Sequence, residues 1–123
     1  MKYHAMITGW GEYALDFLND PKANCIIIFN NDAPPDLAEI SVLHTKEQLL
    51  AIPAAGDTVI IGEKVFTITA VGEEAKSTLR ELGHCTLSFK GGNVPERPGC
   101  IMLEGDEPLT AADIQVENMI EIY

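Results

Sequence analysis

Short runs of β-branched and aromatic residues recur along the chain, and several are closed by glycine, proline or asparagine. Such runs, bounded by turn residues, are typical of β-strands. Strands are expected in a first segment that holds His4 and in 24–29, 37–44, 58–61, 64–69, 85–89, 100–104 and 116–123. Many short strands in 123 residues predict a sandwich or a barrel, and closing the sheet removes edges that aggregate. The pattern favours a mainly β fold, a small closed or nearly closed β-barrel with one or two short helices.

Helical patterning is rare in this sequence. Within 72–83, Ala75, Leu79 and Leu82 fall on one face of a helix, and Gly83 suits a left-handed C-cap. A shorter helical turn is expected at 13–18, and 91–99 is expected to be a loop. A doubly wound α/β sheet needs helices repeated between its strands, so this class is excluded.

The charge balance excludes several kinds of partner. Eight Lys and Arg against 19 Asp and Glu give a net charge of -11, which disfavours binding to nucleic acid and to anionic membranes. No apolar run approaches the roughly 20 residues that span a bilayer, and no apolar stretch of signal-peptide length follows the N-terminus. We therefore expect one soluble, cytoplasmic domain over 1–123 that inserts in no membrane.

The cysteines and histidines leave a metal site as one alternative. Cys25, Cys85 and Cys100 are an odd number without CxxC spacing, so free and mostly buried thiols are expected. His44, His84 and Cys85 could supply zinc ligands from distant segments, although no pair has the usual ligand spacing. The expectation is no metal and no cofactor. A small β-barrel that binds a partner or a metal, without phosphotransfer, stays open as the alternative function.

A second interpretation of the histidines is phosphoryl transfer. His44 ends an apolar run and His84 follows Gly83, so both lie at element ends where a scaffold presents side chains, whereas His4 is expected at an ordinary surface position. Each could also be a purely structural histidine. A neutral imidazole is a good nucleophile toward phosphorus. Such a carrier needs hydrogen-bond donors and a docking surface but no nucleotide-binding loop, and the sequence contains none.

Two blocks carry a family resemblance. The first is APPDLAE at 33–39 running into VLH at 42–44, and the second is TAVG at 69–72 continuing to LRELGHCTLSF at 79–89. With these blocks the chain resembles the glucitol/sorbitol-specific enzyme IIA component of the bacterial sugar phosphotransferase system (PTS) over nearly its whole length. Residues 1–123 then form one IIA domain of this type.

The resemblance implies a phosphotransferase with a phosphohistidine intermediate. The phosphorylated histidine falls on His44, which accepts the group from the phosphocarrier protein HPr and passes it to the IIB component of the same permease, for uptake and phosphorylation of glucitol/sorbitol. His84 matches the second block and is expected to support the transfer. Beside these, the Thr45 hydroxyl and Lys46 are candidate donors to the phosphoryl oxygens, although Lys46 could equally face solvent.

Overall fold

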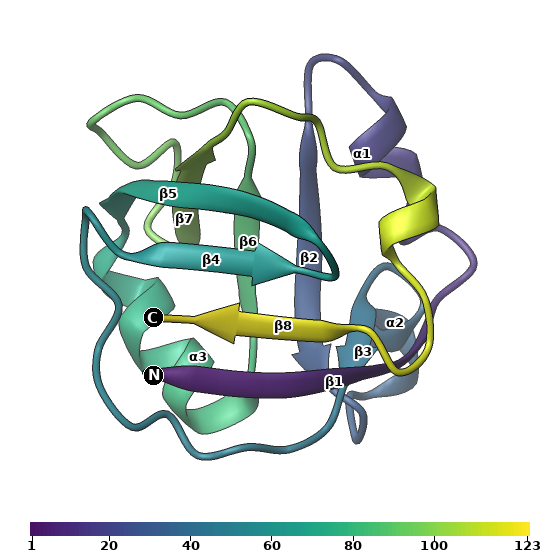
Figure 1. Cartoon of the computed structure of the whole chain (residues 1–123). Helices are drawn as coiled ribbons and strands as arrows, with labels where there is room; N and C mark the ends of the chain where they lie inside the picture. Colours follow the sequence, from purple (N-terminus) through teal and green to yellow (C-terminus); the bar gives the residue numbers. More distant parts are fainter.

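Eight β-strands close into a barrel in the computed structural model, which describes all residues from 1 to 123 (Figure 1). The strands are β1 (Tyr3–Trp10), β2 (Cys25–Asn30), β3 (Val42–His44), β4 (Thr58–Ile61), β5 (Lys64–Val71), β6 (Cys85–Ser88), β7 (Cys100–Glu104) and β8 (Met119–Ile122). Their order around the barrel is β1-β3-β2-β6-β7-β5-β4-β8, and β8 pairs with β1 to close the ring. The prediction of a mainly β, closed barrel is confirmed.

The strand pairing brings three chain segments to one rim of the barrel. Strands β2 and β3 are parallel, with Asn30 opposite His44, so both strands end at the same rim. Strand β6 is antiparallel to β2 and pairs Cys85 with Ile28, so β6 begins where β2 ends. The segment just before β6 holds Gly83 and His84. The topology alone therefore places His44 and His84 near each other.

Side chains fill the inside of the barrel. One cluster of 21 buried residues forms the core. Its largest members with almost no exposure are Tyr3, Ile7, Ile26, Ile28, Ile61, Ile68, Leu79, Leu87, Ile101, Leu103, Ile114 and Ile120. Small barrels typically pack their interior in this way and leave no channel. Any chemistry on a larger partner must therefore take place at the outer surface or the rim.

Four short helical elements surround the barrel: α1 (Asp16–Asn19), α2 (Pro35–Ala38), α3 (Glu73–Leu82) and the 3-10 helix η1 (Ala111–Asp113). Helix α3 confirms the main helix prediction, and Ala75 and Leu79 are buried as expected. The prediction that Leu82 packs with them is wrong, because this side chain is 44% exposed. Leu82 is the last helical residue before the turn at Gly83, and the helical period does not show where the covered face stops.

The expected strand over 37–44 is also wrong in its first half. Pro35 occupies the start of α2, a position that favours proline because its fixed backbone angle suits the first turn. The helical turn continues in the bond from the Ala38 N–H to the Pro34 carbonyl, 2.8 Å. The Ser41 hydroxyl then donates to the Leu37 carbonyl at 2.7 Å, and only Val42–His44 is a strand.

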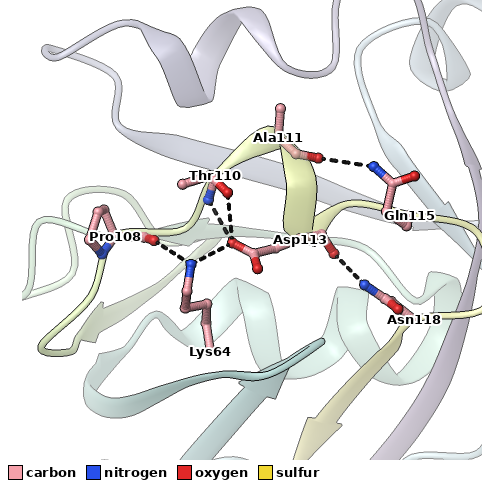
Figure 2. A network of polar contacts seen from close by, with 7 residues as sticks. All are labelled: Lys64, Pro108, Thr110, Ala111, Asp113, Gln115 and Asn118. Carbon is pink, nitrogen blue, oxygen red and sulfur yellow. Dashed lines mark hydrogen bonds and ion pairs between the residues drawn. The ribbon is translucent and has the colours of Figure 1, made fainter.

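A polar network fastens the long β7–β8 connection to the β4–β5 hairpin (Figure 2). The Lys64 ammonium donates to Asp113 Oδ2 at 2.9 Å and to the Pro108 carbonyl at 3.1 Å. The same carboxylate oxygen accepts from the Thr110 N–H at 2.8 Å and from the Thr110 hydroxyl at 3.1 Å. We name Lys64, Pro108, Thr110 and Asp113 the Lys64 latch. Asn118 adds a bond to the Asp113 carbonyl, 3.0 Å.

All three cysteines are free thiols in the structure. Cys85 and Cys100 are buried and Cys25 is half-buried. Burial raises the pKa of each of them, which keeps the thiols protonated. None of the helices combines the length and the apolar character that crossing a bilayer requires.

Candidate functional site

Four residues meet at the rim where β2 and β3 end and β6 begins: Asn30, His44, Gly83 and His84, here named the His44 cluster. Asn30 and His44 are the last residues of two parallel strands and lie opposite each other. Gly83 and His84 connect the end of α3 to β6. The cluster therefore depends on three segments that are far apart in the sequence.

The His44 ring is buried, and both of its nitrogens face carbonyl oxygens. Nδ1 lies 2.8 Å from the Thr45 carbonyl oxygen, and Nε2 lies 2.8 Å from the Gly83 carbonyl oxygen. A neutral imidazole carries a single N–H, so one of these carbonyls then faces a lone pair. A ring protonated on both nitrogens donates to both carbonyls. Tyr3 packs edge-on against the ring, with centroids 5.9 Å apart.

Gly83 is the residue that closes the cluster over His44. Its φ of +62° is the left-handed C-cap of α3, and its N–H and that of His84 return to the Leu79 and Thr78 carbonyls at 3.0 and 3.2 Å. A Cβ at Gly83 would overlap Asn30 Oδ1 and lie 2.7 Å from His44 Cε1. Only glycine therefore fits both the backbone angle and the space beside the histidine.

His84 is held less tightly than His44. Its ring is half-buried, and Nδ1 lies 3.2 Å from the Ile28 carbonyl oxygen. The ring lies over Phe29 with centroids 4.7 Å apart and planes tilted by 32°. No hydrogen bond within the protein involves Nε2. His84 thus offers the more accessible ring nitrogen of the two histidines.

The other predicted site residues are partly engaged elsewhere. The Thr45 hydroxyl accepts from the Met6 N–H at 3.0 Å, and the Thr45 carbonyl holds His44 Nδ1. The Lys46 ammonium lies 3.1 Å from the Asp32 carboxylate, with both side chains more than half exposed. His4 is exposed and 3.9 Å from Glu121, outside the cluster.

Asn30 is the cluster member that sequence reasoning missed. Its side chain is buried, and its Oδ1 makes no hydrogen bond. In the sequence it stands in Asn30-Asn31-Asp32, which predicts only a turn after a strand. The available signal was its position directly after the expected strand over 24–29, where side chains reach the rim.

Neither histidine of the cluster lines any of the four hollows described for this surface. These four have volumes of about 260 to 560 Å³. Four of the seven residues that line the hollow of about 560 Å³ are acidic: Glu63 in the β4–β5 turn, and Glu104, Asp106 and Glu107 at and after the end of β7. The histidines therefore belong to the barrel rim and not to one of these four hollows, with His84 half-buried and His44 buried beneath Gly83.

Comparison with known proteins places this architecture in a family. A family model described as PTS system glucitol/sorbitol-specific IIA component matches residues 2–121. The PTS system glucitol/sorbitol-specific EIIA component of Escherichia coli (strain K12) is 38% identical over 106 residues, which is 86% of this chain and 84% of that protein. The protein of the same name from Shigella flexneri is similar to the same extent.

A solved structure gives the same result for the fold. The crystal structure of a PTS system IIA component from Enterococcus faecalis V583 superimposes with a TM-score of 0.77 at 27% identity, covering 97% of this chain and 98% of that chain. The chain belongs to the family of glucitol/sorbitol-specific IIA components of the PTS.

Proposed function

We propose that the protein is a cytoplasmic phosphoryl carrier that accepts a phosphoryl group from phospho-HPr and passes it to the IIB component of a glucitol/sorbitol permease. Family membership supports this role, together with a pair of histidines that lines none of the four hollows described above. The observation that carries the proposal is the convergence of His44 and His84 on one rim.

His44 is the proposed acceptor, through Nε2. The Thr45 carbonyl accepts a hydrogen bond from Nδ1–H at 2.8 Å, which leaves the lone pair on Nε2. In the closed state the Gly83 carbonyl lies 2.8 Å from Nε2, so this peptide must turn away before phosphorus can approach. A glycine is suited to this motion because it accepts backbone angles that other residues avoid.

The transfer itself is a displacement at phosphorus. The Nε2 lone pair of His44 forms the new N–P bond while the N–P bond of phospho-HPr breaks, and its electron pair stays on the HPr imidazole. Charge spreads over the three phosphoryl oxygens in the transition state, so positioned donors supply most of the catalysis. The onward step to IIB is the same displacement, with His44 as the leaving group.

His84 is the proposed supporting donor. When its ring is protonated on both nitrogens, Nδ1 donates to the Ile28 carbonyl and Nε2–H is available for a phosphoryl oxygen. Thr45 contributes through its carbonyl on His44, and Lys46 can exchange Asp32 for the incoming phosphate. Because His84 Nε2 is the more accessible nitrogen, phosphorylation of His84 itself is the second candidate.

A docking surface for HPr and IIB surrounds the cluster. The exposed Leu82 and Glu81 precede Gly83, and Asp32 follows the end of β2. The net charge of -11 favours encounter with a partner that presents a basic face, and salt weakens such steering. The initial transfer rate from phospho-HPr should fall as ionic strength rises; a flat or rising profile would contradict the electrostatic part of this proposal.

Labelling with phosphoenolpyruvate tests the function directly. The protein should take up label only when enzyme I and HPr are both present. His44→Ala should abolish labelling, whereas His84→Gln should slow it by roughly a hundred- to thousandfold, the usual effect of losing one transition-state donor. The opposite pattern would reverse the two roles. Full labelling of both variants would remove the site, and no label on the wild-type protein would overturn the function.

A further inference from the structure

The side-chain amide oxygen of Asn30 is buried in the protein and has no hydrogen-bond partner there. Asn30 is only 6% exposed, and its Oδ1 is buried without a hydrogen bond. Buried polar groups in folded proteins are almost always paired, because an unpaired one loses its bonds to water and gains nothing. The main chain of Asn30 is engaged, since its carbonyl accepts from the Ala33 N–H at 3.0 Å. The missing hydrogen bond therefore belongs to the side-chain amide and not to the main chain.

The position of this amide connects it to His44. Asn30 and His44 are opposite residues of the parallel pair β2 and β3. A Cβ built on Gly83 would meet both Asn30 Oδ1 and His44 Cε1, so the amide and the imidazole border the same small space. His44 Cε1 lies between the two ring nitrogens, one of which is the proposed acceptor.

We propose that Asn30 binds the phosphoryl group carried by His44, by donating hydrogen bonds from its side-chain NH2 to a phosphoryl oxygen. This inference rests on the proposed function and adds a phosphate-binding residue to it. In the closed state the Gly83 carbonyl occupies the approach to His44 Nε2. When that carbonyl moves away and phosphorus arrives, three acceptor oxygens enter the space beside Asn30.

An asparagine suits this task for two reasons. Its amide has a carbonyl oxygen at one end and an NH2 group at the other, and a half-turn about the last side-chain bond exchanges them. Without phosphate, the unpaired Oδ1 faces this space. When phosphate is bound, the half-turn brings the NH2 group into the same place, where it can donate to a phosphoryl oxygen. The amide is also neutral, so it orients the group without adding a charge that would hold it back from IIB.

The alternative is that Asn30 only shapes the turn at Gly83. A purely structural Asn30 would tolerate the loss of its side-chain NH2, as in Asn30→Ser, as long as the fold is kept. A phosphate-binding Asn30 would not. Asn30→Asp is the most severe variant, because it buries a carboxylate that repels the phosphoryl oxygens and donates nothing. The neighbouring Asn31 is exposed and provides the control, since Asn31→Asp adds the same charge one residue away.

The test measures single-turnover transfer from phospho-HPr by rapid quench, alongside the 31P resonance of the phosphohistidine. Asn30→Asp should slow transfer at least a hundredfold, Asn30→Ala about tenfold to a hundredfold, and Asn31→Asp less than threefold. Asn30→Ser keeps one donor and should lose less than Asn30→Ala, a comparison that holds even if the Asp variant does not fold. The 31P resonance should move in Asn30→Ala and stay in Asn31→Asp.

Three results would overturn the inference while leaving the carrier function intact. One is transfer by folded Asn30→Ala and Asn30→Ser at equal rates within threefold of wild type. Another is an unchanged 31P resonance in Asn30→Ala. The third is label carried by His84 and not by His44. Absence of label on wild-type protein would instead overturn the proposed function, so the two failures are distinguishable.

Discussion

The Lys64 latch and the His44 cluster are both polar groupings that join segments distant in sequence, yet their hydrogen bonding differs. In the latch, one Asp113 oxygen accepts from Lys64 and twice from Thr110, and Lys64 also reaches the Pro108 carbonyl (Figure 2). In the His44 cluster, Asn30 Oδ1 is unpaired, and two carbonyls compete for the protons of one imidazole.

From this difference we infer a structural role for the Lys64 latch and a functional role for the His44 cluster. Polar groups whose hydrogen bonds are all made within the protein hold a loop in place and have no free donor or acceptor for a ligand. Buried polar groups that lack hydrogen-bond partners lower the stability of the fold. Such groups are therefore expected where a ligand or a reaction requires them. The latch should therefore matter for stability alone, and the cluster for transfer.

The largest effect is expected from Gly83→Ala. A left-handed backbone angle costs a residue with a side chain about 1–3 kcal/mol, and the overlap with Asn30 adds to this. We expect a lower urea midpoint together with loss of transfer, because a side chain at this position would hinder the proposed turning of the Gly83 peptide away from His44. The control is Gly92→Ala, at φ +86° with nothing within 4 Å of its Cβ. Equal effects of the two variants on transfer would contradict the interpretation.

Lys64→Met should weaken the fold and leave transfer intact. It removes the only cation from a largely buried carboxylate, whose side chain is 14% exposed, so a loss of about 1–3 kcal/mol in unfolding free energy is expected. Lys76→Met is the matched control, since its pair with Glu73 is solvated and i,i+3, worth about 0–1 kcal/mol. Chemical denaturation with a transfer assay on the same samples measures both. A transfer defect in Lys64→Met would break the division of roles.

The sequence was sufficient for most of the fold because the decisive signals are local. The segment 58–69 alternates around Gly62, and it forms the β4–β5 hairpin. The segment 72–83 has a helical period and a C-cap glycine, and it forms α3. The error at 37–40 arose because its alternation is compatible with a strand, while Pro35 and the Ser41 hydroxyl favour a helical turn.

The site was predictable only in part. His44 and His84 follow from their places at element ends, together with the family resemblance. Neither the burial of His44 nor the cover by Gly83 could be predicted, since both depend on the parallel pairing of β2 with β3 and on where β6 begins. Asn30 was missed for the same reason, because its relation to His44 exists only across that pairing.

A smaller effect concerns the Lys64 latch, whose contribution to stability should depend on pH. Burial alone would raise the pKa of Asp113, but the bonds from Thr110 and Lys64 and the charge of Lys64 outweigh it and hold this pKa below its ordinary value. A carboxyl group whose pKa is lower in the folded state stabilises the fold at pH values above its unfolded pKa of about 4. This stabilisation is lost as the pH falls through the pKa of the folded state.

The stability difference between wild type and Asp113→Asn should therefore be about 1 kcal/mol at pH 6 and shrink toward pH 2. Asp57, whose pKa is also lowered, titrates in both proteins and cancels in the subtraction. Urea unfolding at a series of pH values measures this. A difference that stays constant from pH 6 to pH 2 would show that the charge on Asp113 does not stabilise the latch.

The smallest effect concerns a second unpaired atom, the hydroxyl of Tyr3, whose ring packs edge-on against His44. It is buried without a partner, and burial raises its pKa, so it stays protonated. No hydrogen bond joins the Tyr3 hydroxyl to the His44 ring, whose two nitrogens face the Thr45 and Gly83 carbonyls instead, so Tyr3 is given no part in transfer. Tyr3→Phe should thus leave the transfer rate within twofold and change stability by at most about 1 kcal/mol, in the stabilising direction. A fall in transfer as large as that in Asn30→Ala would contradict this expectation. Phosphate binding would then be a shared role of the buried polar groups around His44 and not a specific role of Asn30.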